Sequence, residues 1–240
     1  MNPLNLVITL SFVTSQEIVV IPSGLRERNK VKRQQAILDS TLVLLRQFPL
    51  ADVSIERIAA HAEVSPATVY NLVGSRDQLL HACIDRVIDR LVDALVRIDP
   101  DADPIAAATA IVEHSADAFI ADQRAYRAII GAIGGTGTGS RLAVDPAQLQ
   151  IAAMRGAQHH GLLRADADPA SIGRQIYLSY NGALLAWAGG LLTDDGFRLA
   201  ALHGLWTALA ANASDAYREE CVARLGRLGP QLTAAGWGTA

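Results

Sequence analysis

The sequence predicts an all-α protein, and three observations lead to that fold class. Beyond the first 21 residues, no stretch shows the period-2 alternation of apolar and polar residues that a half-buried strand requires. Apolar residues recur instead at helical spacing along the chain. Three Asp-Pro pairs, at 103–104, 145–146 and 168–169, place an N-cap residue directly before a proline, which is typical of a helix start.

Composition excludes several classes of protein. Half of the 240 residues are apolar and 19% are charged, so the chain can bury a core and is not intrinsically disordered. Two cysteines, Cys83 and Cys221, are too few for a disulfide scaffold or a multi-cysteine metal module. They suit a cytoplasmic protein, which we expect to be nucleoid-associated if it binds DNA.

The N-terminal residues do not fit a membrane span or a signal peptide. The apolar stretch 4–13 is too short to cross a membrane. No Lys or Arg precedes it and no clean cleavage site follows it. We therefore expect residues 1–25 to form a flexible extension, and a start codon assigned too early would leave the same pattern.

Positive charge is concentrated in one short segment. The net charge of the chain is −3, yet residues 26–33 contain five basic residues against Glu27 alone. Such a basic arm on a mildly acidic body fits an anionic partner, and the alternative is a solvated helix start. The arm consists of Arg26, Arg28, Lys30, Lys32 and Arg33.

Helices are expected along most of the chain. The first runs from roughly Arg28 to Gln47, ends before Pro49, and has an apolar face marked by Val31, Leu38, Leu42 and Leu45. Later helices are expected at about 104–121, 123–133, 146–160, 168–192, 194–213 and 215–228, with Asp194 as a cap. Residues 134–140 form a flexible glycine-rich connection. No Lys-Ser/Thr pair follows them, so they are not a phosphate-binding loop.

Residues 54–80, SIERIAAHAEVSPATVYNLVGSRDQLL, contain two short helices and the start of a third. Ser54 can cap the first, whose apolar face comprises Ile55, Ile58, Ala59 and Ala62. The chain breaks at Glu63-Val64, and Ser65-Pro66 starts the second helix. Its inner side contains Val69, Leu72 and Val73, and its outer side contains Pro66, Ala67, Tyr70 and Asn71. Gly74-Ser75 ends the second helix, and Ser75 caps the next one.

Two short helices joined by a tight turn predict a helix-turn-helix, whose second helix enters a DNA major groove about 12 Å wide. Small side chains at the start of that helix let its backbone approach a phosphate, which the helix dipole favours. The Asn71 amide can pair with adenine, and Tyr70 can reach a phosphate or pack on a thymine methyl group.

These residues resemble the TetR family of bacterial transcriptional repressors. The resemblance covers residues 28–90 and rests on Ile58-Ala59, Ala62-Glu63-Val64-Ser65, Thr68, Tyr70, Val73, Ser75-Arg76 and Leu79. Glu63 stands where the family usually has Gly, Val73 where it has Phe, and Arg76 where it has Lys. If Glu63 adopts a positive φ, its backbone is strained by about 1 kcal/mol.

The resemblance implies a two-part architecture. An N-terminal three-helix DNA-binding domain would span 26–76, a C-terminal helical ligand-binding and dimerisation domain 77–228, and a tail 229–240. Base contacts would come from Ser65, Pro66, Ala67 and Asn71. Phosphate contacts would come from Ser54, Thr68, Tyr70 and Arg76. The basic arm, with Arg28, Lys30 and Lys32, would add phosphate or minor-groove contacts. Two alternatives stay open: Thr68 can bond only within its helix, and Arg76 can simply face solvent.

The resemblance also implies a homodimer on a palindromic operator and a small-molecule effector. Helices 168–192 and 194–213 are the expected dimerising pair, because small residues such as Gly182 permit close packing. A binding ligand would shift the protein between two states. Composition suggests an apolar ligand with a polar handle, held by Phe119, Tyr126, Ile130, Met154, Tyr177, Tyr180 and Asn181, although these residues also suit an ordinary core.

Nothing in the sequence favours catalysis. It contains neither G-x-S-x-G nor H-E-x-x-H, and the adjacent His159 and His160 diverge on a helix. We therefore expect no enzyme activity, no cofactor and no metal site. The competing interpretation is a helical small-molecule-binding protein or enzyme that keeps this architecture without reading DNA.

Overall fold

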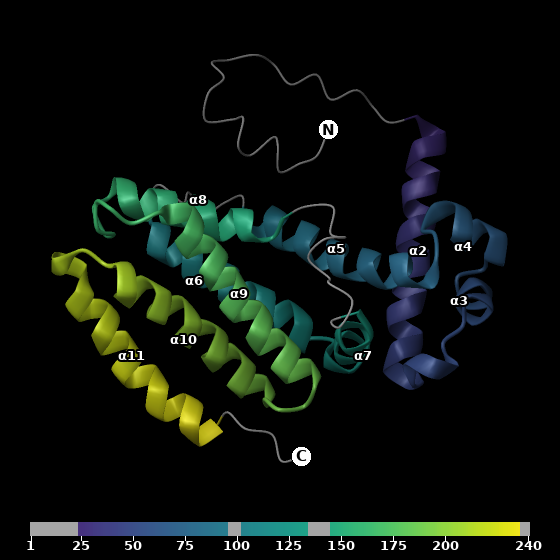
Figure 1. Cartoon of the computed structure of the whole chain (residues 1–240). Helices are drawn as coiled ribbons and strands as arrows, with labels where there is room; N and C mark the ends of the chain where they lie inside the picture. Colours follow the sequence, from purple (N-terminus) through teal and green to yellow (C-terminus); the bar gives the residue numbers. More distant parts are fainter. Residues whose placement is uncertain (1–23, 96–101, 134–144, 236–240) are drawn as a thin grey trace. The chain divides into compact units, whose positions relative to one another are not determined.

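The structure, a computed structural model, describes residues 24–95, 102–133 and 145–235. Most of the expected N-terminal extension (1–25), the glycine-rich connection 134–140 and the last five residues lie outside the described residues. The described residues form ten α-helices, one short 3-10 helix and no strand, which confirms the all-α prediction (Figure 1). Contacts divide the chain into two units between Arg86 and Val87, within helix α5.

The N-terminal unit contains α2 (Leu25–Gln47), η2 (Leu50–Asp52), α3 (Ile55–His61), α4 (Pro66–Leu72) and the first half of α5 (Arg76–Leu95). Helix α2 ends at Gln47 as predicted, and Leu38, Leu42 and Leu45 are buried. Val31 lies on the same helical face but is 49% exposed. Residues 25–33 are all exposed, so the start of α2 extends beyond the core of the unit.

Serine caps begin three helices of this unit at the predicted positions. Ser54 Oγ accepts a hydrogen bond from the Arg57 N–H at 3.2 Å, and Ser65 Oγ accepts one from the Thr68 N–H at 3.2 Å. Ser75 forms a capping box, because its N–H donates to Gln78 Oε1 at 2.7 Å while its Oγ accepts from the Gln78 N–H at 3.3 Å. These caps keep α3 and α4 short and fix where each begins.

The turn between α3 and α4 confirms the positive φ considered for Glu63, whose φ is +54°. The Glu63 N–H donates to the Ala60 carbonyl at 3.3 Å, and the Val64 N–H donates to the Ala59 carbonyl at 3.0 Å. This pair of bonds is a Schellman motif, in which the left-handed position normally holds glycine. Glu63 therefore adopts a strained conformation that positions α4.

The C-terminal unit contains the end of α5, α6 (Pro104–Ile120), α7 (Gln123–Ile133), α8 (Ala147–His159), α9 (Pro169–Ala188), α10 (Asp194–Asn212) and α11 (Asp215–Ala235). Helix α9 packs against α7, α8 and α10, and α10 also packs against α6 and α11 (Figure 1). Asp103 and Asp168 cap α6 and α9 as predicted, since their carboxylates accept the first free backbone N–H groups.

Three predicted helix limits are wrong in this unit. Helix α9 ends at Ala188 rather than near Leu192, because Gly190 has φ +81° and reverses the chain. Helix α10 is capped by Thr193, whose Oγ accepts the Gly196 N–H at 2.9 Å, and not by Asp194. The Asp194 carboxylate instead accepts Trp187 Nε1 at 2.7 Å. Helix α11 continues through Pro230 to Ala235 instead of ending near Leu228.

Aromatic side chains fill the core where α9 meets α10. Trp187 and Phe197 are fully buried and stack with their ring centroids 5.3 Å apart. Tyr180 lies 5.5 Å from Phe197, and its phenol oxygen accepts a hydrogen bond from Ser115 Oγ of α6 at 2.8 Å. Such pairs stabilise the core beyond the area they bury.

Candidate nucleic-acid interface and ligand site

The outer face of α4 is exposed as the sequence predicts. Pro66, Ala67, Tyr70 and Asn71 all lie at the surface, whereas Val69 is fully buried beneath them. Leu72 and Val73, predicted to point inward, are half-buried. The single anchor at Val69 therefore leaves most of this seven-residue helix available to a partner.

Two polar groups on this face have no partner within the described residues. The Tyr70 side chain is 53% exposed, and neither its hydroxyl nor the Asn71 amide forms a hydrogen bond there. Ser65 and Thr68 behave differently, because their hydroxyls bond to each other at 2.8 Å. Tyr70 and Asn71 can therefore offer their full hydrogen-bonding capacity to DNA, while Thr68 already satisfies part of its own.

A hollow of about 350 Å³ separates the basic start of α2 from α4. On the α4 side it is lined by Thr68, Asn71 and Leu72. On the α2 side it is lined by residues at positions i, i+3, i+4 and i+7 of one helical face, namely Arg26, Asn29, Lys30 and Arg33. Three cations therefore flank the outer face of α4 without any charge on α4 itself.

Only some residues of the basic arm line this hollow. Lys30 lies with Thr68 and Asn71, whereas Arg28 and Lys32 are not part of its lining. Asn29 was not among the predicted residues, although the helical spacing of Arg26, Lys30 and Arg33 could have indicated it. Arg28 and Lys32 stay predictions for phosphate contacts outside the hollow.

The remaining predicted phosphate-binding residues also have structural roles. Ser54 caps α3, and the Arg76 guanidinium donates a hydrogen bond to the Leu50 carbonyl. A guanidinium has five N–H donors, so this bond orients Arg76 without using all of them. Arg57 stacks on Phe48 with its guanidinium carbon 3.5 Å from the ring centroid, which braces the chain before α3.

The predicted effector residues lie mostly in the core of the C-terminal unit. Five are buried, namely Phe119, Tyr126, Ile130, Met154 and Tyr180, whereas Tyr177 and Asn181 are half-buried. The Phe119 and Tyr126 rings meet edge to face with their centroids 5.2 Å apart. These seven residues stay a prediction for ligand binding.

One buried polar side chain escaped the sequence analysis. Gln150 of α8 is 3% exposed, and its Nε2 donates to the Ala108 carbonyl of α6 at 3.0 Å. Its Oε1 is buried without a hydrogen-bond partner among the described residues. Burying such an acceptor costs free energy unless something donates to it. A glutamine on the apolar face of α8 was the signal that could have revealed it.

The described residues hold no cluster of three or more His, Cys, Asp or Glu suited to a metal ion. Burial raises the pKa of the Cys83 thiol to about 12 and that of Cys221 to about 11, so both thiols stay protonated at neutral pH.

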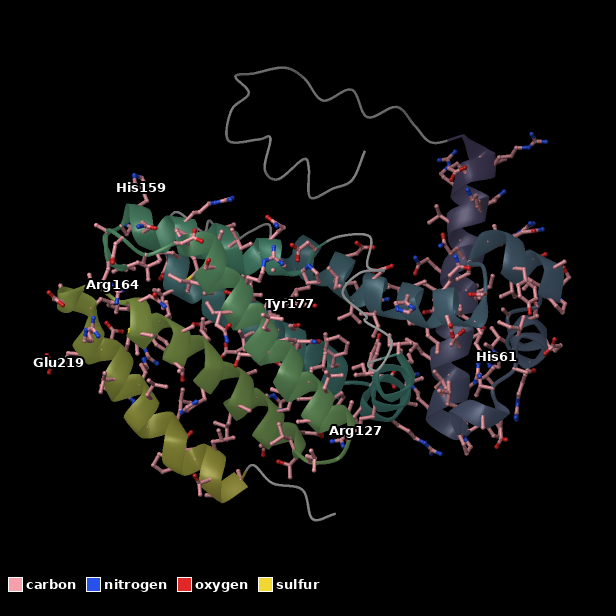
Figure 2. The ribbon with its side chains drawn as sticks, viewed as in Figure 1. His61, Arg127, His159, Arg164, Tyr177 and Glu219 are labelled. Atoms are coloured by element: carbon pink, nitrogen blue, oxygen red, sulfur yellow. The ribbon has the colours of Figure 1, made fainter. Side chains whose placement is uncertain are left out.

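His159 is exposed at the end of α8 (Figure 2). Within the described residues, no helix combines the length and apolarity needed to cross a membrane.

A helix-turn-helix with an uncharged, hydrogen-bonding outer face beside a basic flank defines a class of DNA-binding regulatory proteins. The comparisons with known proteins agree. A sequence model of the family described as "Bacterial regulatory proteins, tetR family" matches residues 37–83, which contain α3, α4 and parts of α2 and α5. Over these 47 residues the chain is similar to the DNA-binding part of that family. No curated protein matches its sequence.

Solved structures share the fold at low sequence identity. The repressor SmeT of Stenotrophomonas maltophilia is 23% identical, with a TM-score of 0.54 over 76% of this chain and 91% of its own. Thermus thermophilus FadR, solved with lauroyl-CoA, is 15% identical, with a TM-score of 0.56 over 74% and 93%. A TetR transcription regulator from Haloarcula marismortui is 18% identical, with a TM-score of 0.61 over 77% and 100%.

Proposed function

We propose that this protein is a dimeric, sequence-specific repressor that a small apolar ligand releases from a palindromic operator. The observation that carries the proposal is the outer face of α4, where Tyr70 and Asn71 are exposed and find no hydrogen-bond partner among the residues that the structure describes. A merely solvated helix face usually carries charge, whereas a recognition helix offers neutral donors and acceptors to base edges.

Each side chain of the interface has a proposed role. Asn71 pairs with a base edge, while Ser65, Pro66 and Ala67 let the start of α4 approach the bases closely. Tyr70, Thr68, Arg76 and Ser54 contact phosphates, and Arg26, Lys30 and Arg33 of α2 hold the backbone that passes the hollow. These cations supply affinity, and Asn71 supplies sequence preference.

An exposed apolar face on α9 supports the dimer. Leu178 and Leu185 are 55% and 38% exposed, and Gly182 lies between them at positions i, i+4 and i+7 of one helical face. A Cβ at Gly182 would meet no atom within 4 Å, so a second helix can approach the backbone there. A two-fold axis through this face would pair α9 with its own copy and present two recognition helices to a palindrome.

The interior of the C-terminal unit supports the effector. Gln150 of α8 is bonded to α6 through its Nε2, while its buried Oε1 finds no donor within the described ranges of the chain. An apolar ligand with one N–H or O–H group would remove that deficit, and its differential affinity for two states would shift the protein off DNA. Among the structural relatives, SmeT represses a multidrug efflux pump and FadR was solved with lauroyl-CoA.

A selection experiment tests the function without knowledge of the operator. The purified protein is incubated with sheared genomic DNA of its source organism, and the retained fragments are sequenced. The matched control is the double variant Tyr70→Ala/Asn71→Ala, which removes only exposed side chains. We expect one or a few palindromic sites, and we expect the control to lose them.

Salt dependence then separates the repressor from the alternative, a helical ligand-binding protein that does not read DNA. A protein with six or more phosphate contacts loses affinity about a thousandfold between 50 and 200 mM salt. Recovery of random DNA in equal amounts by both proteins, or no binding at low salt, contradicts the repressor. The search would then turn to the ligands of the C-terminal unit.

A further inference from the structure

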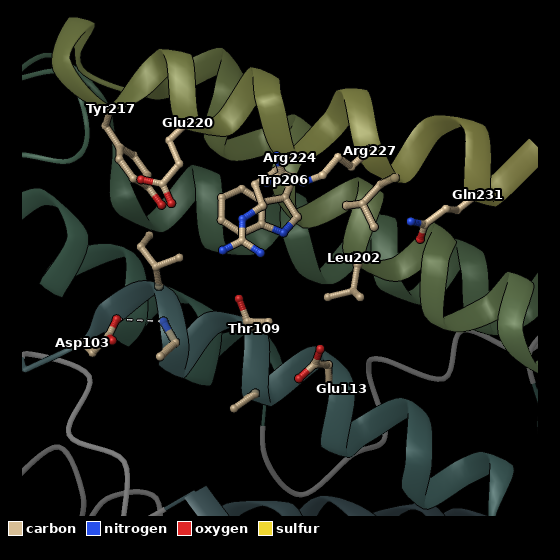
Figure 3. Close-up of a pocket in the computed structure, with 14 residues that line it drawn as sticks. Asp103, Thr109, Glu113, Leu202, Trp206, Tyr217, Glu220, Arg224, Arg227 and Gln231 are labelled. Atoms are coloured by element: carbon tan, nitrogen blue, oxygen red, sulfur yellow. Dashed lines mark hydrogen bonds between the residues drawn. The ribbon is translucent and has the colours of Figure 1, made fainter.

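A groove of about 740 Å³ runs along the C-terminal unit between α6 and α11, with α10 as its floor (Figure 3). Its volume falls within the range of small-molecule sites, roughly 300–1,000 Å³. None of the residues predicted to bind the effector lines it. The groove is therefore distinct from the effector site considered above.

Helix α11 creates this groove. It packs along α10, yet Cys221 is its only buried residue among 21. The face of α11 that turns toward α6 carries Tyr217, Glu220, Arg224, Arg227 and Gln231 at successive helical turns. Helix α11 therefore contacts α10 through a narrow strip around Cys221. Its polar side chains line one side of the groove.

The floor and the adjoining parts of the walls are apolar. Trp206 and Leu202 of α10 lie one turn apart on the floor, and Leu228 of α11 and Ile105 of α6 extend the apolar surface. Trp206 is only 4% exposed, so Leu202, Leu228 and Ile105 provide most of the apolar surface that a ligand meets, and the tryptophan contributes an edge of its ring. This surface suits the apolar or aromatic body of an organic molecule.

Two arginines of α11, Arg224 and Arg227, line the groove and can bind an anion. The Arg224 guanidinium carbon lies 5.2 Å from the centroid of the Trp206 ring, a contact that orients its planar donors. Arg227 follows three residues later, so the two side chains share one wall. Neither guanidinium forms an ion pair or a hydrogen bond with the described residues, so their donors are free.

The carboxylates around the groove narrow the choice of ligand. Asp103 caps α6 by accepting the Ala106 N–H at 2.9 Å, and Glu113 and Glu220 stand exposed on the two walls. Burial and the nearby Glu220 raise the pKa of Tyr217, so its phenol stays protonated and can donate. A compact, multiply charged anion would be repelled by these carboxylates, whereas a singly charged organic anion would gain the apolar floor.

We propose that the groove between α6 and α11 binds an amphipathic organic anion, with its anionic group on Arg224 and Arg227 and its apolar body on Trp206, Leu202 and Leu228. Two guanidiniums can donate parallel hydrogen bonds to a carboxylate or sulfonate. The charge of the ligand decides its orientation, and the floor supplies most of its contact area.

Two fluorescent probes with the same ring system test the proposal on the full-length protein. One is 8-anilinonaphthalene-1-sulfonate, an anion, and the other is N-phenyl-1-naphthylamine, which lacks the sulfonate. We expect Arg224→Ala/Arg227→Ala to weaken binding of the anionic probe about tenfold or more and to leave the neutral probe within about twofold. Arg155→Ala, at an exposed position on α8, is the matched control and should change neither affinity.

A second variant avoids any effect of the arginine changes on folding. Glu113→Gln removes one negative charge from the opposite wall and should strengthen binding of the anionic probe by about two- to fivefold, without changing the neutral one. Energy transfer from tryptophan to the bound anionic probe should fall in Trp206→Phe. Equal effects on both probes, or unchanged affinity of the anionic probe in both charge variants, would overturn the proposal.

Discussion

Polar groups without hydrogen-bond partners in the described residues are exposed on the outer face of α4 but buried around Gln150. Tyr70 and Asn71 have no hydrogen-bond partner in the described part of the chain but are exposed to water, so they cost little free energy while DNA is absent. Gln150 Oε1 is buried in the core and has no partner among the described residues, and there the same deficit destabilises the fold. Changes on the outer face of α4 should therefore affect DNA binding, whereas changes around Gln150 should affect the stability of the fold.

The largest expected effect lies in the core of the C-terminal unit. Phe197→Ala removes a fully buried ring that stacks on Trp187, and it should lower the free energy of unfolding by about 3–5 kcal/mol. Urea unfolding followed by far-ultraviolet circular dichroism measures the change. A loss below about 1 kcal/mol would mean that this interior tolerates truncation as an exposed surface does.

The exposed face of α9 should behave like α4, as a surface that serves binding. Leu178→Glu/Leu185→Glu should weaken the proposed dimer about a hundredfold or more, because two apolar contacts become charged. Sedimentation velocity across a concentration series measures it. Val222→Glu, at a 56% exposed position on α11, is the control, and an equal effect there would contradict dimerisation through α9.

On α4 itself, Asn71→Ala should cost about 1–3 kcal/mol of operator binding and relax the preference for one base pair. The free energy of unfolding should stay within about 0.5 kcal/mol, because the side chain is exposed. Binding isotherms on the selected operator and on single-base variants measure both effects. Uniform weakening on all sequences would reassign Asn71 to a phosphate contact.

At Gln150, in contrast, a substitution should stabilise the fold. Gln150→Met removes a buried acceptor for which the described residues supply no donor, and it should raise the free energy of unfolding by about 1 kcal/mol. If this acceptor serves the effector, the variant should also release DNA less readily in its presence. A destabilised variant would show instead that the bond from Nε2 to Ala108 is worth more than the unpaired oxygen costs.

The smallest effect concerns the backbone of the turn before α4. Glu63→Gly relieves a φ of +54° and should raise the free energy of unfolding of the N-terminal unit by about 1 kcal/mol. Gly161→Ala, at φ +68° in the same type of turn after α8, should lower stability by a similar amount. Thermal unfolding of both variants checks the pair, and a loss of stability in Glu63→Gly would contradict the assignment of strain.

The sequence by itself determined the elements whose signals are local. Serine and aspartate caps with proline at the next position located the starts of α4, α6 and α9, because a cap needs only the backbone of its own first turn. The outer face of α4 followed from helical periodicity over six residues. The resemblance to the TetR family, confirmed by the match at residues 37–83, depends on the same short segment.

Only the tertiary structure decided features that depend on distant partners. Thr193 holds the cap position of α10 while the Asp194 carboxylate accepts Trp187 Nε1 of α9, and the choice of Arg26, Lys30 and Arg33 depends on where α4 lies against α2. Gln150 and the groove beside α11 involve helices far apart in the chain, and no local pattern records which faces meet. Local backbone bonds are encoded within a few residues, whereas burial and charge pairing arise only when separate helices pack together.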